Sequence, residues 1–123
     1  MMERIKLPSG KEIDLVDVLK FCYDLSETDT QILLKLVKGD EYDVDKLARE
    51  LGLSKATVNR SLNKLVELGF VLRRRERRQS VGRPKYKYYV EDSQSLVEKL
   101  KNDMERCAEV MKRHISKLIE GMK

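Results

Sequence analysis

The sequence is poor in the residues that build metal sites and disulfide frameworks. It contains two cysteines, Cys22 and Cys107, and one histidine, His114, among 123 residues. There is no CxxC motif, no pair of histidines and no Cys/His cluster, which argues against a structural zinc site. Both cysteines lie among apolar residues, where a thiol acts as a small hydrophobic side chain, and redox sensing is the alternative. We expect neither a metal nor a cofactor.

Long apolar runs and catalytic motifs are also missing. No run could span a bilayer and no signal-peptide pattern opens the chain, so we expect no membrane partner and a cytoplasmic, nucleoid-associated location. There is no nucleophile–base pair or glycine-rich phosphate loop, which makes an enzyme the least supported class of function. The length suits a single domain with a modest core.

Positive charge is abundant and concentrated in one segment. Charged residues make up 38% of the chain and the net charge is +5. Residues 73–87 include eight Lys or Arg and one Glu, a net of +7, which leaves 5 − 7 = −2 for the rest. A cationic segment of this kind indicates a polyanionic partner, and a solvated basic loop is the alternative.

Residues 54–68 have the pattern of a DNA recognition helix. Ser54 is a good N-cap, and Gly69 suits the left-handed turn at the far end. One stripe at helical spacing is apolar: Val58, Leu62, Leu65 and Leu68. The opposite side is small, amide-bearing or cationic: Ala56, Asn59, Arg60, Asn63 and Lys64. Amides and arginine are the groups that bind purine edges in a major groove, whereas a merely solvated face usually mixes Glu with Lys.

Three further helices are predicted before this one. Residues 15–25 carry an apolar stripe, and residues 27–38 follow a capping box, Ser26 to Asp29. Asp43 is expected to cap a short helix over residues 44–51, which a glycine turn joins to the recognition helix, giving a helix-turn-helix motif. Before them, residues 1–14 alternate weakly around a Pro-Ser-Gly turn, which is compatible with a short hairpin.

After Gly69 the period changes from helical to extended. Residues 70–78 and 85–90 are predicted to pair as a β-hairpin, with Gly82 and Pro84 in its tip. Such a hairpin can lie along a DNA backbone or enter the minor groove. Narrow minor grooves attract arginine, so Arg83 is the best candidate for insertion.

The last predicted helix begins near residue 92 and carries a heptad pattern of apolar residues to about residue 121. This spacing favours a two-stranded dimer interface, with folding back onto its own domain as the alternative. The residues that we assign to the interface are Val18, Cys22, Leu96, Val97, Leu100, Met104, Cys107, Met111, Ile115 and Leu118.

Together these motifs resemble the winged helix-turn-helix transcription regulators, in particular the small archaeal proteins of the TrmB and MarR families. The residues that carry the resemblance are 23–29, 44–54, 57–62, 68–71 and 82–86. The resemblance implies a homodimer that binds a pseudo-palindromic operator with one recognition helix per half-site. The resemblance does not imply a sugar ligand for this chain, because the residues that carry it include no effector domain. Binding of an unknown small-molecule effector is left open.

The sequence therefore predicts a mainly α (α+β) fold with three parts. Residues 1–14 form an N-terminal extension, residues 15–91 a winged helix-turn-helix domain, and residues 92–123 a dimerisation helix. Phosphate contacts are assigned to Ser54, Lys55, Thr57 and Lys64, and base contacts to Ala56, Asn59, Arg60 and Asn63. Sequence-independent affinity is assigned to the hairpin cations Arg74, Arg75, Arg77, Arg78, Arg83, Lys85 and Lys87.

The expected function is a sequence-specific regulator that binds double-stranded DNA. Two alternatives use the same fold. One is an architectural DNA-binding protein of low specificity, and the other is a protein-interaction module within a transcription or replication assembly. The amide and arginine face favours the first function, because a helix that only binds phosphates would carry more lysine.

Overall fold

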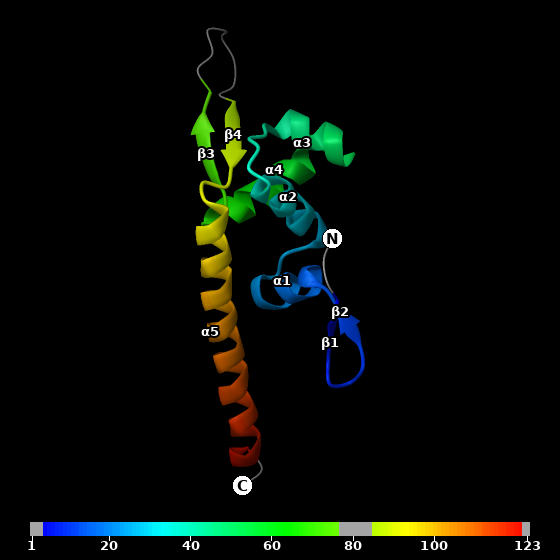
Figure 1. Ribbon diagram of the computed structural model, residues 1–123, viewed down its shortest axis with the longest axis vertical. Helices are drawn as coiled ribbons and strands as arrows, with labels where there is room; N and C mark the ends of the chain where they lie inside the picture. The colour runs from blue at the N-terminus through cyan, green and yellow to red at the C-terminus, as the bar shows by residue number, and fades with distance from the viewer. Residues whose placement is uncertain (1–3, 77–84, 122–123) are drawn as a thin grey trace. The chain divides into compact units, whose positions relative to one another are not determined.

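The computed structural model describes residues 4–76 and 85–121, in which helices predominate over two small sheets (Figure 1). In chain order the elements are β1 (Ile5–Lys6), β2 (Glu12–Ile13), α1 (Leu15–Tyr23), α2 (Glu27–Val37), α3 (Val44–Leu51), α4 (Lys55–Glu67), β3 (Leu72–Arg75), β4 (Tyr86–Tyr89) and α5 (Ser93–Glu120). The chain divides into two compact units, Met1–Ser93 and Gln94–Lys123, which are described separately below. The predicted mainly α fold with a winged helix-turn-helix is confirmed.

Side-chain caps fix where the helices begin. Ser26 accepts a hydrogen bond from the backbone of Asp29, whose carboxylate accepts one in return from the Ser26 backbone, so the predicted capping box is present. Asp43 and Ser54 cap α3 and α4 as expected. The first helix ends at Tyr23, two residues earlier than predicted, because the next residue adopts a left-handed conformation with φ of 57°.

The core of the first unit lies between α2, α3 and α4. Val58, Leu62 and Leu65, which the sequence predicted as an apolar stripe, are fully buried there. The other fully buried aliphatic side chains are Leu19, Leu25, Ile32, Leu33, Leu36, Leu47 and Val71. Three polar residues are buried with them: Asp29, Thr30 and Ser61. The β1–β2 hairpin lies beside the start of α1 (Figure 1).

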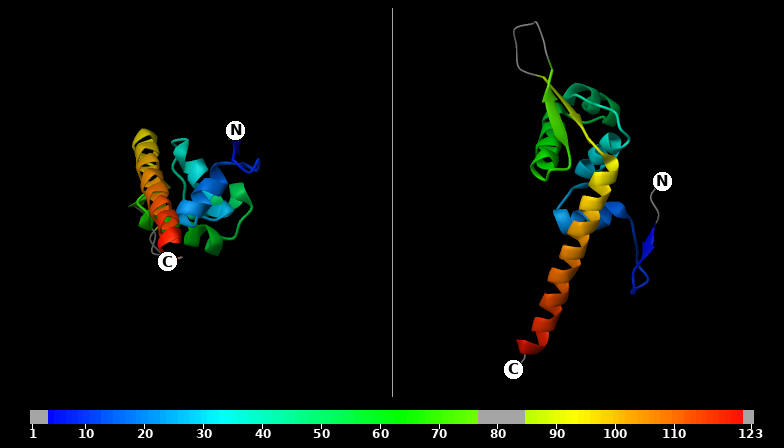
Figure 2. Two further views of the ribbon diagram at one scale, coloured as in Figure 1. Left: turned by 90° about the horizontal axis from the view of Figure 1, so that it is seen from below. Right: turned by 60° about the vertical axis from the view of Figure 1, so that its left-hand side comes forward.

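Strands β3 and β4 pair antiparallel and form the wing of the fold. Arg74 lies opposite Lys87 in this ladder, and Arg75 lies opposite Tyr86. Tyr88 also exchanges two backbone hydrogen bonds with Tyr42, of 3.0 and 2.8 Å, just before α3 begins. Backbone pairing therefore joins the wing to the helix-turn-helix, and Figure 2 shows its two strands beside the helices of this unit.

Helix α5 begins at Ser93, whose hydroxyl donates a 2.7 Å hydrogen bond to the backbone carbonyl of Val37 at the end of α2. Within the described part of the chain, no helix combines the length and apolar character needed to cross a membrane. Over the same residues, no group of three or more His, Cys, Asp or Glu side chains could hold a metal ion.

Candidate DNA-binding surface

Helix α4 buries one side and exposes the other, as the sequence predicted. Val58, Leu62 and Leu65 are fully buried, and Gly69 follows the helix with φ of 79°. The four side chains assigned to base edges all lie on the exposed side: Ala56, Asn59, Arg60 and Asn63. Arg60 lies close to Thr57, with 3.5 Å between the guanidinium Nη2 and the threonine hydroxyl. The described chain thus leaves amides and an arginine open to a ligand on one helix face.

The N-terminus of α4 is organised by hydroxyl groups. The Ser54 hydroxyl accepts a 3.1 Å hydrogen bond from the Thr57 backbone N–H and donates a 2.9 Å bond to the Thr57 hydroxyl. Beside it, the Lys55 side chain is 70% exposed. Exposed backbone N–H groups at a helix start, together with a nearby ammonium, suit a phosphate oxygen.

Lys64 has a different environment from the other residues assigned to DNA. Its ammonium donates a hydrogen bond to the backbone carbonyl of Asp24 and lies 3.5 Å from the Asp29 carboxylate. Asp24 follows the end of α1, and Asp29 lies in the first turn of α2. Lys64 lies one helical turn after Arg60 and its side chain is 37% exposed, but its ammonium already has partners within the protein.

The wing presents two different faces. On one, Arg73 stacks over the ring of Tyr86, with 4.5 Å from the guanidinium carbon to the ring centroid. On the other, cations contact acids from residues 41–45 and from the wing itself. Arg74 contacts Glu41 at 2.6 Å. Lys87 lies 3.8 Å from Asp43 and 3.6 Å from Glu76, and Lys85 lies 3.5 Å from Asp45.

Asp45 connects the wing to the recognition helix. One of its carboxylate oxygens lies 3.2 Å from the Lys55 ammonium, and the other lies 3.5 Å from that of Lys85. A hydrogen bond from Lys55, together with the positive charges of both lysines, holds the pKa of Asp45 below its ordinary value. These residues border a hollow of about 340 Å³, lined by Asp43, Val44, Asp45, Lys55, Asn59, Lys85, Tyr86 and Tyr88.

Some assigned residues cannot be placed in the structure, and two residues that contact the assigned cations were not predicted from the sequence. Arg77, Arg78 and Arg83 lie outside the described residues. The acids Glu41 and Asp45 were not assigned any role, although both contact cations that were. The signal that could have indicated them is the density of acids at residues 40–45, which directly precede and begin α3. Only the fold brings this segment against β4, through the Tyr42–Tyr88 pairing.

Helix α5 has an apolar series that is exposed in a single copy of the chain. Of the residues assigned to a dimer interface, four are exposed on this helix: Val97, Met111, Ile115 and Leu118. Val110 and Ile119 extend this surface, and Leu96 is already buried in one copy. Val18, Cys22, Leu100, Met104 and Cys107 are partly buried. On α1, the Phe21 side chain is 69% exposed. Phe21 was not among the residues that the sequence assigned to the dimer interface.

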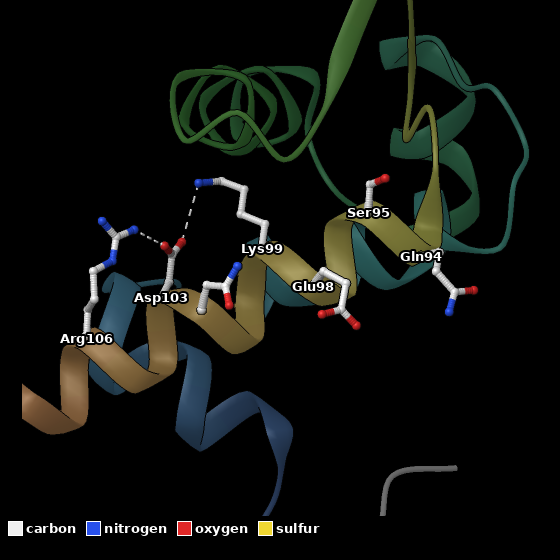
Figure 3. Close-up of a pocket in the computed structure, with 7 residues that line it drawn as sticks. Gln94, Ser95, Glu98, Lys99, Asp103 and Arg106 are labelled. Atoms are coloured by element: carbon white, nitrogen blue, oxygen red, sulfur yellow. Dashed lines mark hydrogen bonds and ion pairs between the residues drawn. The ribbon is translucent and has the colours of Figure 1, made fainter.

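A polar strip on α5 borders an open hollow of about 470 Å³ (Figure 3). The Asp103 carboxylate lies between two cations of the same helix, one turn away on either side (Figure 3). Lys99 approaches it to 3.4 Å, and Arg106 donates a hydrogen bond to it. Pairs at this spacing are the usual contacts of an exposed helix face, and the hollow is lined by this one helix.

The order of helices α2 to α4 and the β3–β4 wing define a winged helix-turn-helix protein. Residues 19–93 match the family model described as "Sugar-specific transcriptional regulator TrmB". The chain is 36% identical to the ST1889 protein of the thermoacidophilic archaeon Sulfolobus tokodaii, with a TM-score of 0.70 over 80% of this chain and 92% of that one. The chain therefore belongs to the TrmB family of transcriptional regulators.

Two solved structures from Methanosarcina mazei Go1 have the same fold. One, titled "Possible transcriptional regulator", has a TM-score of 0.76 at 21% identity and covers 97% of this chain and 96% of its own. The other, a MarR transcriptional regulator, has a TM-score of 0.54 at 22% identity over 87% of this chain and 81% of its own. A search of curated proteins found no match.

Proposed function

We propose that the protein is a homodimeric regulator that binds double-stranded DNA at specific sequences. In this proposal α4 enters the major groove, and the wing lies against the backbone or in the minor groove. The observation that carries the proposal is the exposed α4 face, on which Asn59, Arg60 and Asn63 lie opposite a fully buried apolar stripe. Arginine suits guanine and asparagine suits adenine, and each good pair discriminates by about 1–3 kcal/mol.

Dimerisation would use the apolar series of α5. Ile115 and Leu118 are 64% and 67% exposed, which is unusual for aliphatic side chains that recur along one helix. Heptad spacing is the pattern that buries such residues between two helices. Two recognition helices related by two-fold symmetry would then bind two half-sites, so we expect a pseudo-palindromic operator.

A solved structure of similar fold supports the DNA partner. The overoxidized form of AbfR has been crystallised bound to DNA, and its chain superimposes with a TM-score of 0.50 at 18% identity. At this identity the likeness concerns the fold alone. The proposal for this chain therefore depends on its own α4 side chains.

The decisive experiment is selection of bound duplexes from a random DNA pool with the full chain. The proposal predicts an enriched motif with two inverted half-sites about one helical turn apart. Affinity that varies little among sequences would instead indicate an architectural protein. No binding to any duplex at low salt would contradict the proposal and favour a role in protein contacts.

A further inference from the structure

One carboxylate joins two cations that belong to different parts of the DNA-binding surface. Asp45 lies in the first turn of α3, Lys55 begins α4, and Lys85 directly precedes β4. Each carboxylate oxygen of Asp45 contacts a different ammonium group. Oδ1 lies 3.2 Å from Lys55 Nζ, and Oδ2 lies 3.5 Å from Lys85 Nζ. An acid is therefore placed at the junction of the recognition helix and the wing.

The two lysines remain accessible to an outside anion. The Lys55 side chain is 70% exposed and that of Lys85 is 36% exposed. Ion pairs in such positions are weak, because water screens the charges and the long side chains lose conformational freedom. A phosphate oxygen offers a lysine the same negative charge as a carboxylate oxygen, so DNA can replace Asp45 at either ammonium.

We propose that Asp45 competes with DNA phosphate for Lys55 and Lys85 and thereby limits sequence-independent affinity. This inference rests on the proposed function, because it concerns the same surface. Asp45 is distinct from Asp43, whose side chain caps α3 by accepting a 2.7 Å hydrogen bond from the Lys46 backbone. That cap and the backbone pairing hold the elements of the surface in place, whereas Asp45 offsets part of the positive charge of its two lysines.

The competition has a consequence for the salt dependence of binding. When a lysine binds phosphate, a counterion leaves the DNA. When both lysines leave Asp45, its bare carboxylate attracts a cation from solution, which offsets part of that release. A neutral residue at position 45 removes the offset. Because one carboxylate carries one charge, the plot of log affinity against log salt should then steepen by at most about 0.9 in total.

The test compares Asp45→Asn with Glu50→Gln in the whole 123-residue chain. Glu50 is a matched control, because it lies on the same helix, pairs with Lys35 at 3.4 Å and has a side chain 38% exposed against 33% for Asp45. Both variants raise the net charge by one. Binding to a random 30-bp duplex would be titrated by fluorescence anisotropy at several salt concentrations.

We expect Asp45→Asn to bind random duplex about two- to fivefold more tightly at low salt, with a steeper salt slope, and Glu50→Gln to match the wild type. The gain should vanish when both lysines are replaced by Gln. Equal affinities of the two single variants, or weaker binding by Asp45→Asn, would overturn the inference. Asp45→Ser is the second neutral replacement should the amide impair folding. If the wild type binds no duplex, the proposed function itself fails.

Discussion

The Ser61 hydroxyl donates a hydrogen bond to the Asp29 carboxylate, and both residues are buried. Ser61 lies on the inner side of the recognition helix α4, and Asp29 lies in the first turn of α2. The same carboxylate accepts a 2.9 Å hydrogen bond from the Ser26 backbone and lies 3.5 Å from the Lys64 ammonium. One acid therefore completes the cap of α2 and joins α2 to α4 through two side chains.

Replacement of Ser61 should destabilise the first unit. Ser61→Ala leaves one oxygen of a buried carboxylate without its hydroxyl donor, which costs about 1–3 kcal/mol. Urea denaturation followed by circular dichroism measures the free energy of unfolding. Ser116→Ala, which removes an exposed hydroxyl from α5, is the control and should change it by less than about 0.5 kcal/mol. Equal stability of both variants would show that the Ser61 contact contributes nothing.

Because of its contacts, Asp29 should also make the free energy of unfolding decrease at low pH. Burial raises the pKa of Asp29, but hydrogen bonds from Ser61 and Ser26 and the charge of Lys64 outweigh it, so the pKa lies below its ordinary value. A lowered folded-state pKa means that the ionised carboxylate stabilises the fold above the ordinary pKa. This contribution is lost as the pH falls through the folded-state pKa.

The prediction is tested by comparing wild type with Asp29→Asn. The difference in their free energies of unfolding should be constant between about pH 5 and 7 and should shrink below about pH 4. Denaturant titrations at half-unit pH intervals would measure it. A difference that stays constant down to pH 2.5 would mean that Asp29 does not titrate as the structure implies.

Arg60→Ala should reduce specific binding more than general binding. Loss of one base contact is expected to cost about 1–3 kcal/mol on the selected operator and much less on random duplex. Gel-shift titrations on both duplexes would measure the two affinities. Arg49→Ala removes an exposed arginine from α3 that lies outside the assigned DNA-contacting residues, and it should leave the ratio of the two affinities unchanged. Equal losses on both duplexes for Arg60→Ala would remove Arg60 from the base-contacting residues.

Leu118→Glu should weaken the proposed dimer. A charge within a heptad seam is costly, because burial removes it from water without a partner. Sedimentation velocity over a range of protein concentrations would show the shift toward monomer. Ser116→Glu adds the same charge to a neighbouring exposed position off the seam and should behave like wild type. A wild-type protein that is monomeric at all concentrations would contradict the dimer proposal itself.

The sequence alone determined the helices of the DNA-binding motif. The limits of α3 were predicted without error, and those of α2 and α4 to within one residue. Caps and helical periodicity act over a few neighbouring residues, so a linear pattern contains the information that they need. The exposed face of α4 followed from the same periodicity, because burying one stripe leaves the opposite side to solvent.

Tertiary structure alone decided which charges meet between separate elements of the first unit. Lys64 faces Asp24 and Asp29, and Lys85 faces Asp45, across separations of 35 to 40 residues that no local pattern connects. The exposed side of α4 was therefore predictable from the sequence, whereas the partners of Lys64 and Lys85 were not. Periodicity indicates on which side of its own helix a side chain lies, but ion pairs between elements depend on how those elements pack.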